Sequence, residues 1–286
     1  MIKWGRNYIL KIQVDDNQEI EITLPITLDF KITRNALATA NTARFTLYNL
    51  SENTRRRIYK DKFSTTVYKG IELRAGYGEK KEDLPLVFKG NIKQAYSHRE
   101  RTEYLTEIEC YDGGFAFLNG EANLSFAANT PDNQILDALI KTLPAINKGV
   151  IGNFNDRLPR GNAYHGNTTD LLKTISDGNF FIDNEKAYCL KDDECIQGNI
   201  NLITSASGLL GSPQREETLL TFDIIFEPRL LVGQILELQS ETETAFNGTY
   251  KVINFEHKGT ISDAVGGKCS TTCGLYYGAK NLKVIR

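Results

Sequence analysis

The sequence predicts a mainly β protein with an α+β insertion, and three observations lead to this fold class. Residues 19–33 alternate almost without a break between apolar and polar side chains, as do residues 8–14. Residues 135–143 instead repeat their apolar side chains at helical spacing, and alternation returns at residues 220–226. Alternation is typical of strands, and a repeat of three or four residues is typical of helices. We therefore expect a β-rich domain at 1–118, a small α+β domain at 119–199 and a second β-rich domain at 200–286.

The composition narrows the class of protein. The 286 residues include 34 Lys and Arg and 36 Asp and Glu, so the charges nearly cancel. Proteins that gain affinity by displacing counterions from phosphates usually carry a basic excess, which argues against a nucleic-acid-binding factor. The sequence shows no signal peptide, and no apolar run approaches the ~20 residues of a membrane span. Its five cysteines are expected as thiols of a protein that folds in a reducing cytosol.

The N-terminal third is expected to consist of short strands. In residues 19–33 the apolar side chains share one parity, and Pro25 predicts a bend or an edge position because proline cannot donate to a strand ladder. Residues 15–17 supply a turn before this segment. Further strands are expected at the following residues: 43–47, 71–77, 86–92 and 103–111. Short strands with glycine-rich breaks indicate a barrel or a sandwich.

The middle third changes character. One helix is expected to begin at Thr130-Pro131 and to end at Pro144. A second helix is expected to begin near residue 168 and to stop at Gly178, and a hairpin that turns at residues 183–185 follows it.

The last third is expected to return to strands. These are predicted at the following residues: 220–226, 235–239 and 249–255. The turn between the last two contains Asn247-Gly248. The chain is therefore expected to have two β units that flank an insertion.

One basic run is a candidate binding site. Arg55, Arg56 and Arg57 lie on a short predicted helix with Ser51 as its N-cap. Because a helix has 3.6 residues per turn, these three side chains fan over roughly 200° and cannot all face one phosphate strand. A solvated helix face or an inter-subunit salt-bridge site is therefore the expected role, in preference to a DNA clamp.

One acidic strand is a second candidate. Glu103, Glu107 and Glu109 share one parity of a predicted strand, opposite Tyr104 and Ile108. These carboxylates form either an ordinary solvent-facing strand face or the acidic wall of a channel. An acidic wall would repel a passing polyanion rather than bind it.

We predict no catalytic, cofactor-binding or metal-binding residues. The three histidines lie in no catalytic signature, and His165, although near Asp170, falls in residues 162–167, which are expected to form a loop. The cysteine pairs 189/195 and 269/273 are spaced more widely than the knuckles of structural zinc sites. No phosphate-binding loop or dinucleotide fingerprint occurs. Ordinary burial of the thiols is therefore expected.

Two stretches of the sequence resemble the baseplate hub proteins of contractile-tailed, Mu-like phages. The N-terminal stretch runs from "FKITRN" through "ARFTLYNL", a short helix, "AGY" and "VFKGNI" to "YDGG". The C-terminal stretch contains "GLLGSP", "PRLLVGQILELQS" and "NGTYKVINFEHKGT". The order and spacing of these motifs are similar to those of the family over most of residues 28–120 and 200–278. The sequence departs from the family's aromatic-Thr pattern near residue 271 and shows no lysozyme or peptidoglycan hydrolase module.

The resemblance implies a fold, an assembly and a set of partners. The two β units would be tube-like β-barrel domains, and three chains would form a homotrimer with a pseudo-sixfold ring. Such a ring adapts the hexameric tail tube to the trimeric spike and forms part of the DNA channel, with DNA only as transiting cargo. The expected partners are the tail tube protein, the central spike protein and baseplate wedge or other hub proteins. The expected location is the tail baseplate of a virion assembled in the bacterial cytoplasm, without a membrane anchor.

Two other functions remain open from the sequence. One is a tail-associated cell-wall hydrolase that uses a carboxylate pair in the middle unit, and the other is a receptor- or carbohydrate-binding tail protein. In the hub interpretation, Arg55, Arg56 and Arg57 are expected at a subunit interface, paired with acidic neighbours on an adjacent domain.

Overall fold

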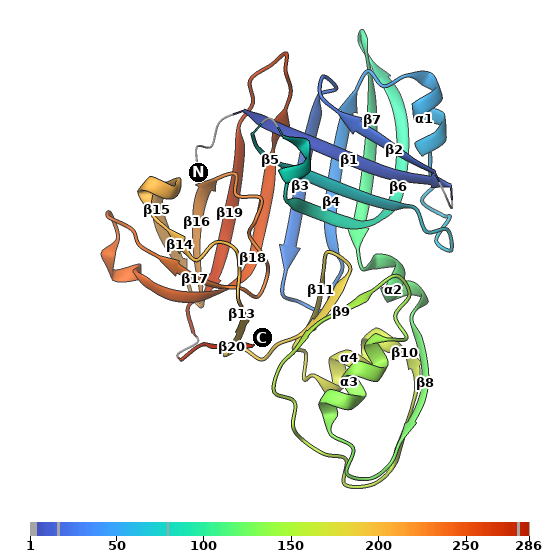
Figure 1. Cartoon of the computed structure of the whole chain (residues 1–286), viewed down its shortest axis with the longest axis vertical. Helices are drawn as coiled ribbons and strands as arrows, with labels where there is room; N and C mark the ends of the chain where they lie inside the picture. Colours follow the sequence, from blue (N-terminus) through green and yellow to red (C-terminus); the bar gives the residue numbers. More distant parts are fainter. Residues whose placement is uncertain (1–4, 16–17, 79, 279–280, 286) are drawn as a thin grey trace.

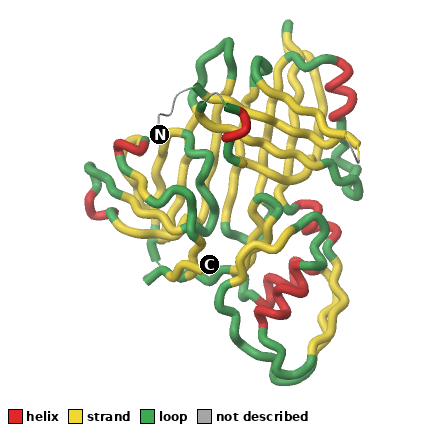
Figure 2. Tube along the Cα trace, viewed as in Figure 1, coloured by secondary structure: helices red, strands yellow, loops and turns green. Residues whose placement is uncertain are grey.

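The computed structural model describes residues 5–15, 18–78, 80–278 and 281–285, and the chain is mainly β, as predicted (Figures 1 and 2). The N-terminal part contains β1 (Arg6–Asp15), β2 (Gln18–Thr23), β3 (Leu28–Asn35), β4 (Asn41–Tyr48), α1 (Glu52–Ile58), β5 (Gly70–Tyr77), the 3-10 helix η1 (Lys81–Asp83), β6 (Leu86–Glu100) and β7 (Glu103–Asp112). The middle part contains α2 (Gly114–Asn119), β8 (Glu121–Phe126), α3 (Asp132–Ile140), β9 (Asn147–Ile151), β10 (Asn162–Asn167), α4 (Thr168–Ile175), β11 (Phe180–Asp183) and β12 (Lys186–Cys189). The C-terminal part contains β13 (Glu194–Ile196), β14 (Leu202–Ile203), η2 (Ser205–Ser207), β15 (Leu209–Glu216), β16 (Leu219–Ile225), β17 (Ile235–Leu238), η3 (Thr244–Phe246), β18 (Gly248–Ile261), β19 (Cys269–Tyr276) and β20 (Lys283–Ile285).

One sheet runs through both β-rich parts. Within the described residues it has 13 strands, in the order β15-β16-β19-β18-β3-β4-β7-β6-β5-β1-β2, with β17 and β14 branching from β18. The two parts join where β3 pairs antiparallel with β18, from Leu28 opposite Ile261 to Asn35 opposite Asn254. The pairings along the main path are antiparallel, so its strands are linked without parallel crossovers.

The N-terminal part folds over itself to bury its apolar faces. Figure 1 shows β1, β2 and β5 crossing the direction of β3, β4 and β7. The inward parity of these strands builds a core that includes Leu10, Ile32, Phe45, Phe88 and Ile108. Each of these five side chains is fully buried, and burial of a large apolar side chain stabilises by about 1.5–3 kcal/mol.

The C-terminal part curls in a similar way around a second core. Its buried side chains include Phe222, Leu236 and Leu275. A hydrogen bond of 2.9 Å from the Ser212 hydroxyl to that of Thr242 ties β15 to the loop before η3. This contact brings β15, the last strand of the sheet, close to the loop between β17 and β18 of the same part.

The middle part has a third core built on α3 and α4. The apolar stripe of α3 buries Ile135, Leu136 and Leu139, as the helical spacing predicted. The helix α4 begins after Asn167, whose side chain accepts hydrogen bonds from the N–H groups of Thr169 and Asp170. The predicted domain boundaries after residues 118 and 199 remain predictions.

The turn between β11 and β12 fastens the middle part to the sheet. The Asp112 carboxylate, at the end of β7, accepts hydrogen bonds from the N–H groups of Asn184 (2.5 Å) and Glu185 (2.8 Å). The Glu185 carboxylate pairs with Lys89 at 3.1 Å and accepts a hydrogen bond from the Tyr68 hydroxyl. The turn that the sequence predicted at residues 183–185 is therefore the point of attachment.

Arg34 of β3 is a buried cation that touches all three parts. Its side chain is 1% exposed, and its guanidinium donates to the Asp183 carboxylate, to the Val87 carbonyl and to the Asn184 side chain (2.6 Å). Its guanidinium carbon also lies 5.8 Å from the ring centroid of Phe255, in the C-terminal core. This one side chain thus links the sheet junction, β6 and the attachment turn of the middle part.

The structure differs from the sequence predictions in a few segments. Residues 162–167, predicted as a loop, form β10, which pairs antiparallel with β8. Polar and small residues dominate β10, so its pairing has no apolar alternation to reveal it. The bend predicted at Pro25 is confirmed as a turn that divides residues 19–33 into β2 and β3, whereas α3 ends at Ile140, before the predicted end at Pro144. Of the turn predicted at residues 15–17, Asp16 and Asn17 lie outside the described residues.

Replacing Arg34 with Met should strongly destabilise the fold, because Asp183 would stay buried without its cation. We expect the free energy of unfolding to fall by about 3–5 kcal/mol in urea titrations. Arg44→Met is the matched control, because the Arg44 side chain is 61% exposed in its ion pair and its loss should cost less than about 1 kcal/mol. Equal losses for the two variants would contradict the role assigned to Arg34.

Asp112→Asn should flatten the dependence of stability on pH. Burial, aided by the nearby Asp183 charge, raises the pKa of the Asp112 carboxyl to about 7. Between its ordinary pKa near 4 and this value, the folded chain holds a proton that the unfolded chain has lost, so this group makes stability fall as pH rises. Urea unfolding between pH 4.5 and 7.5 should show a shallower decline for Asp112→Asn, by up to ~1.4 kcal/mol per pH unit. The exposed Asp170→Asn is the control, and parallel curves for Asp112→Asn and the wild type would contradict the prediction.

Candidate functional site

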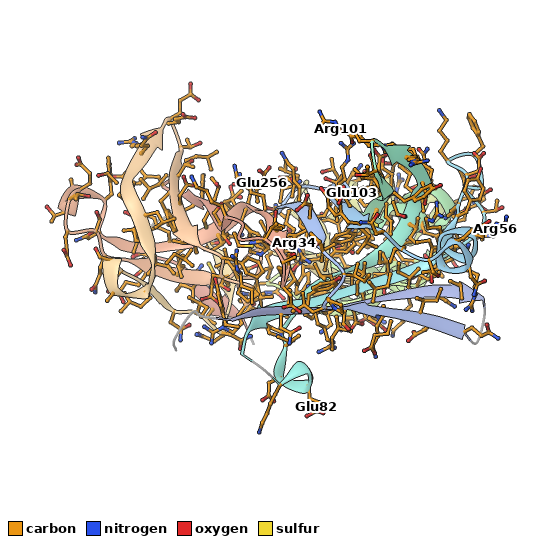
Figure 3. All side chains as sticks on the ribbon, turned by 90° about the horizontal axis from the view of Figure 1, so that it is seen from above. Arg34, Arg56, Glu82, Arg101, Glu103 and Glu256 are labelled. Atoms are coloured by element: carbon orange, nitrogen blue, oxygen red, sulfur yellow. The ribbon has the colours of Figure 1, made fainter. Side chains whose placement is uncertain are left out.

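The outer face of the sheet is polar across the junction of the two β-rich parts. Side chains of one parity on β3, β4 and β7 form the buried core, and those of the other parity are partly or fully exposed. Figure 3 shows Glu103 and Glu256 on one side of the molecule, Glu82 on the opposite side, and Arg34 between the layers. We call this surface, formed by the outward parity of β3, β4, β6, β7 and β18, the polar face.

Ion pairs offset the charges of the polar face. Across the sheet junction, the Lys31 Nζ lies 3.0 Å from the Glu256 carboxylate. Farther along, the Glu109 carboxylate pairs with Arg44 at 2.7 Å and with Lys93 at 3.5 Å. Burial would raise the pKa of Glu109, but the hydrogen bond from Arg44 and the charge of Lys93 outweigh it and lower the pKa. The carboxylate is therefore ionised at neutral pH, with two cations beside it.

A hollow of about 460 Å³ lies at the middle of this face. Its lining includes Lys31, Arg44, Lys93 and Glu109, together with Thr33 and Thr42 and the neighbouring positions 43, 110 and 111. Arg44 and Lys93 pair with Glu109 inside this lining, whereas Lys31 pairs with Glu256, which does not line the hollow. Three cations and one carboxylate therefore line the hollow, and Arg44 and Lys93 share that carboxylate.

The structure places the predicted acidic residues on one face of β7. Glu107 and Glu109 point outward with the same parity, and Glu103 lies at the tip of the β6–β7 hairpin. The Glu107 carboxylate accepts a hydrogen bond of 3.0 Å from the Tyr96 hydroxyl. Because Arg44 and Lys93 flank Glu109, this strand belongs to a surface of mixed charge. Its assignment to a channel wall remains a prediction.

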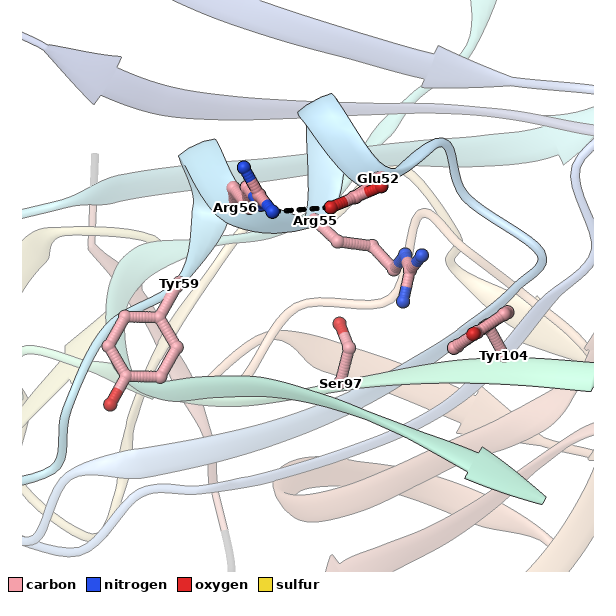
Figure 4. A pocket seen from close by; sticks show the side chains of 6 residues that line it. All are labelled: Glu52, Arg55, Arg56, Tyr59, Ser97 and Tyr104. Carbon is pink, nitrogen blue, oxygen red and sulfur yellow. Dashed lines mark ion pairs between the residues drawn. The ribbon is translucent and has the colours of Figure 1, made fainter.

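The three arginines of α1 make different contacts within the chain. The helix is capped as predicted, with the Ser51 hydroxyl accepting from the Thr54 N–H. Arg55 lies over the Tyr104 ring, 3.9 Å from its centroid, and Arg56 pairs with Glu52 one turn earlier at 2.5 Å (Figure 4). Arg57 donates to the Gln18 side chain at 2.8 Å. The three side chains fan out as the helical spacing predicted, and their expected place in a subunit interface remains a prediction.

A pocket of about 540 Å³ opens between α1 and β6. Figure 4 shows its lining: Glu52, Arg55, Arg56, Tyr59, Ser97 and Tyr104. Two aromatic side chains after α1 are exposed: Tyr59, which lines the pocket, is 55% exposed, and Phe63 is 80% exposed. We call this region, α1 with residues 59–63 and the β6–β7 hairpin, the α1 edge.

The histidines and cysteines considered from the sequence lie on several different elements. His165 lies on β10, and the buried His257 shares a hydrogen bond of 2.7 Å with Thr271. The cysteines at 189, 195, 269 and 273 lie on β12, β13 and β19, and burial raises the pKa of the Cys189 thiol to about 12. Within the described residues, no group of three His, Cys, Asp or Glu side chains is placed to hold a metal ion.

The carboxylates beside the middle part are committed to the fold. Asp112 and Asp183 are 0% and 3% exposed, and both are hydrogen-bonded to groups of the chain itself. A hydrolase would need a carboxylate pair that a polysaccharide can reach. These two acids therefore do not provide the pair that the hydrolase alternative requires.

A known protein family matches part of the chain. The family described as Baseplate hub gp41 matches residues 144–263, from the middle part to the end of β18. No curated protein sequence matches the chain. Among the residues that the structure describes, no helix has the length and apolar character needed to span a membrane.

Solved tail proteins share the fold over almost the whole chain. The tail protein from Neisseria meningitidis MC58 has a TM-score of 0.62 at 10% identity, over 96% of this chain and 97% of that one. The 43 kDa tail protein of prophage MuSo2 from Shewanella oneidensis has a TM-score of 0.61 at 8% identity, over 95% and 96%. The E. coli c3393 protein, described as a type VI secretion component similar to the T4 tail proteins gp27 and gp5, gives 0.61 at 10% identity, over 95% and 77%.

Proposed function

We propose that this chain is the structural hub of a contractile phage tail or a related injection particle. This proposal extends the predicted resemblance to baseplate hub proteins, which is confirmed. In this role three copies form a ring with pseudo-sixfold symmetry, because each chain supplies two β-rich parts. The ring fits the hexameric tail tube on one side and the trimeric spike on the other. Its further partners are baseplate wedge or other hub proteins, and the chain acts without catalysis.

The observation that carries this proposal is the continuous, charge-paired polar face. The N-terminal part contributes four strands to it and the C-terminal part contributes β18, which pairs with β3. Three copies side by side would present six β-rich parts, which is what an adaptor between threefold and sixfold symmetry needs. We propose that this face lines the central channel.

The charges of the face suit a channel that must pass DNA without binding it. Fixed unpaired cations would bind phosphates by releasing counterions, and the affinity would rise with each added contact. Lys31, Arg44 and Lys93 instead lie within 4 Å of Glu256 or Glu109. Each carboxylate thereby competes with a passing phosphate for the same cation.

Ring assembly tests the proposal directly. Light scattering should give a mass near three protomers, and negative-stain images should show a threefold ring with a central hole. A chain that stays monomeric at every concentration would contradict the proposed function.

The variant Arg55→Ala/Arg56→Ala/Arg57→Ala should weaken this assembly and leave the protomer folded. Arg56 and Arg57 make exposed contacts and Arg55 is half-buried over Tyr104, so the loss of stability should be about 1 kcal/mol per contact or less. Lys141→Ala/Lys148→Ala/Lys186→Ala removes the same charge from the exposed surface of the middle part and is the control. Unchanged assembly of the arginine variant, measured by light scattering, would contradict the interface role of α1.

Removing two carboxylates from the polar face should create DNA binding. In Glu109→Gln/Glu256→Gln the cations Lys31, Arg44 and Lys93 lose their partners, so the affinity for duplex DNA should rise about tenfold or more at 50 mM salt. Fluorescence anisotropy with a labelled duplex would measure the affinity and its decline with salt. Glu82→Gln/Asp83→Asn makes the same change in net charge on η1, whose Glu82 lies on the opposite side of the molecule in Figure 3. An equal gain in this control would contradict the special role of the polar face.

A further inference from the structure

One histidine is buried at the junction of the two β-rich parts. His257 of β18 lies opposite Ile32 of β3 in the strand pairing that joins the parts (Figure 1), and it is 1% exposed. Its ring centroid lies 5.3 Å from that of Phe226, in the N-terminal core, and 4.6 Å from that of Phe255, in the C-terminal core. The imidazole therefore packs between the two cores, and separation of the parts would expose it.

The hydrogen bond of this imidazole suits a neutral ring. The Nδ1 of His257 lies 2.7 Å from the Thr271 hydroxyl oxygen, which also accepts the N–H of Glu227 at 3.1 Å. A neutral Nδ1 can accept the hydroxyl proton of Thr271, so the hydroxyl both donates and accepts. A protonated ring has two N–H donors and no acceptor, and the hydroxyl proton would then lose this partner. A buried donor without a partner is costly, so protonation opposes the closed junction.

The charges around the ring also oppose protonation. From β3, the ring faces the positive charge of Arg34, which is itself buried. The nearby carboxylates are already paired with arginines, Asp183 with Arg34 and Glu227 with Arg229 at 3.0 Å. The other titratable groups on the elements packed around the ring have a raised pKa and are neutral: Tyr77 of β5, and Cys269 and Cys273 of β19. A charged imidazole would therefore meet a cation and no free carboxylate.

We propose that the β3–β18 junction is an acid-sensitive joint, in which protonation of His257 loosens the pairing of the two β-rich parts while each part keeps its own core. Burial and the charge of Arg34 lower the pKa of His257 well below its usual value. In an opened junction the exposed ring would have the ordinary pKa near 6.5. Opening therefore takes up a proton below that pH, and the open population should rise about tenfold for each further pH unit. The joint is closed at neutral pH and loosens in mild acid.

Hydrogen exchange of the wild-type chain tests this inference. Between pH 7.5 and 4.5, after correction for the intrinsic rate of exchange, the protection of β3 and β18 amides should fall about tenfold per pH unit below 6.5. The amides in the pairing of β5 with β6 serve as the internal reference and should keep their protection. The experiment needs no assembled ring, so it stands apart from the test of the proposed function.

The variant His257→Gln keeps an acceptor for the Thr271 hydroxyl and carries no titrating group. Its β3 and β18 amides should show no extra loss of protection in acid. The controls are His98→Gln and His165→Gln, which remove the other two histidines of the chain and should keep the acid response. Because the Asp112 carboxyl gives the opposite dependence on pH, the quantity to compare is the difference between wild type and variant in the same strands.

A second measurement covers the case in which His257→Gln does not fold. In NMR spectra of the folded wild type, the His257 ring should still be neutral at pH 5.5. A folded chain in which this ring is already charged at pH 5.5 would overturn the inference. So would a junction whose protection is the same at pH 7.5 and 4.5, or an acid response that His257→Gln retains in full.

Discussion

A single buried guanidinium holds the architecture together. Arg34 lies on β3 directly opposite Phe255 of β18, at the line where the N-terminal and C-terminal parts share one sheet. Its hydrogen bonds reach β6 and the turn that attaches the middle part. A buried cation is costly unless it is paired and its donors are used, so its partners must all be in place at once. The relative placement of the three parts is thus coupled to one side chain.

The continuous sheet then explains why the surface features occur where they do. Because β3 pairs with β18, the polar residues of two β-rich parts face the same way and form one surface. Because β5 pairs with only the first half of β6, the second half of β6 has an open edge beside α1. The same strand pairing thus produces both the polar face and the open edge of β6.

Local patterns in the sequence predicted the elements, but not the long-range contacts. Alternation predicted the core parity of β3, and Ser51 predicted the start of α1. The sequence did indicate that Arg34 is buried, since Arg34 has the inward parity that Leu28, Phe30 and Ile32 define. Its partners could not be predicted, because Asp183 lies 149 residues away. The polar strand β10 gave no alternation, and the cations beside Glu109 come from β4 and β6, which only the folded sheet brings together.

The β3–β18 pairing also determines how long β3 must wait for its partner while the chain is synthesised. Ile32 meets His257, so 257 − 32 = 225 residues must be added after β3 before its partner exists. At about 5–20 residues per second, this takes roughly 10–45 s. During that time β3 has β4 on one side and no strand on the other, which is a hazard for aggregation on the ribosome. The charged residues Asp29, Lys31 and Arg34 along that strand would discourage a nascent neighbour from pairing with it before β18 arrives.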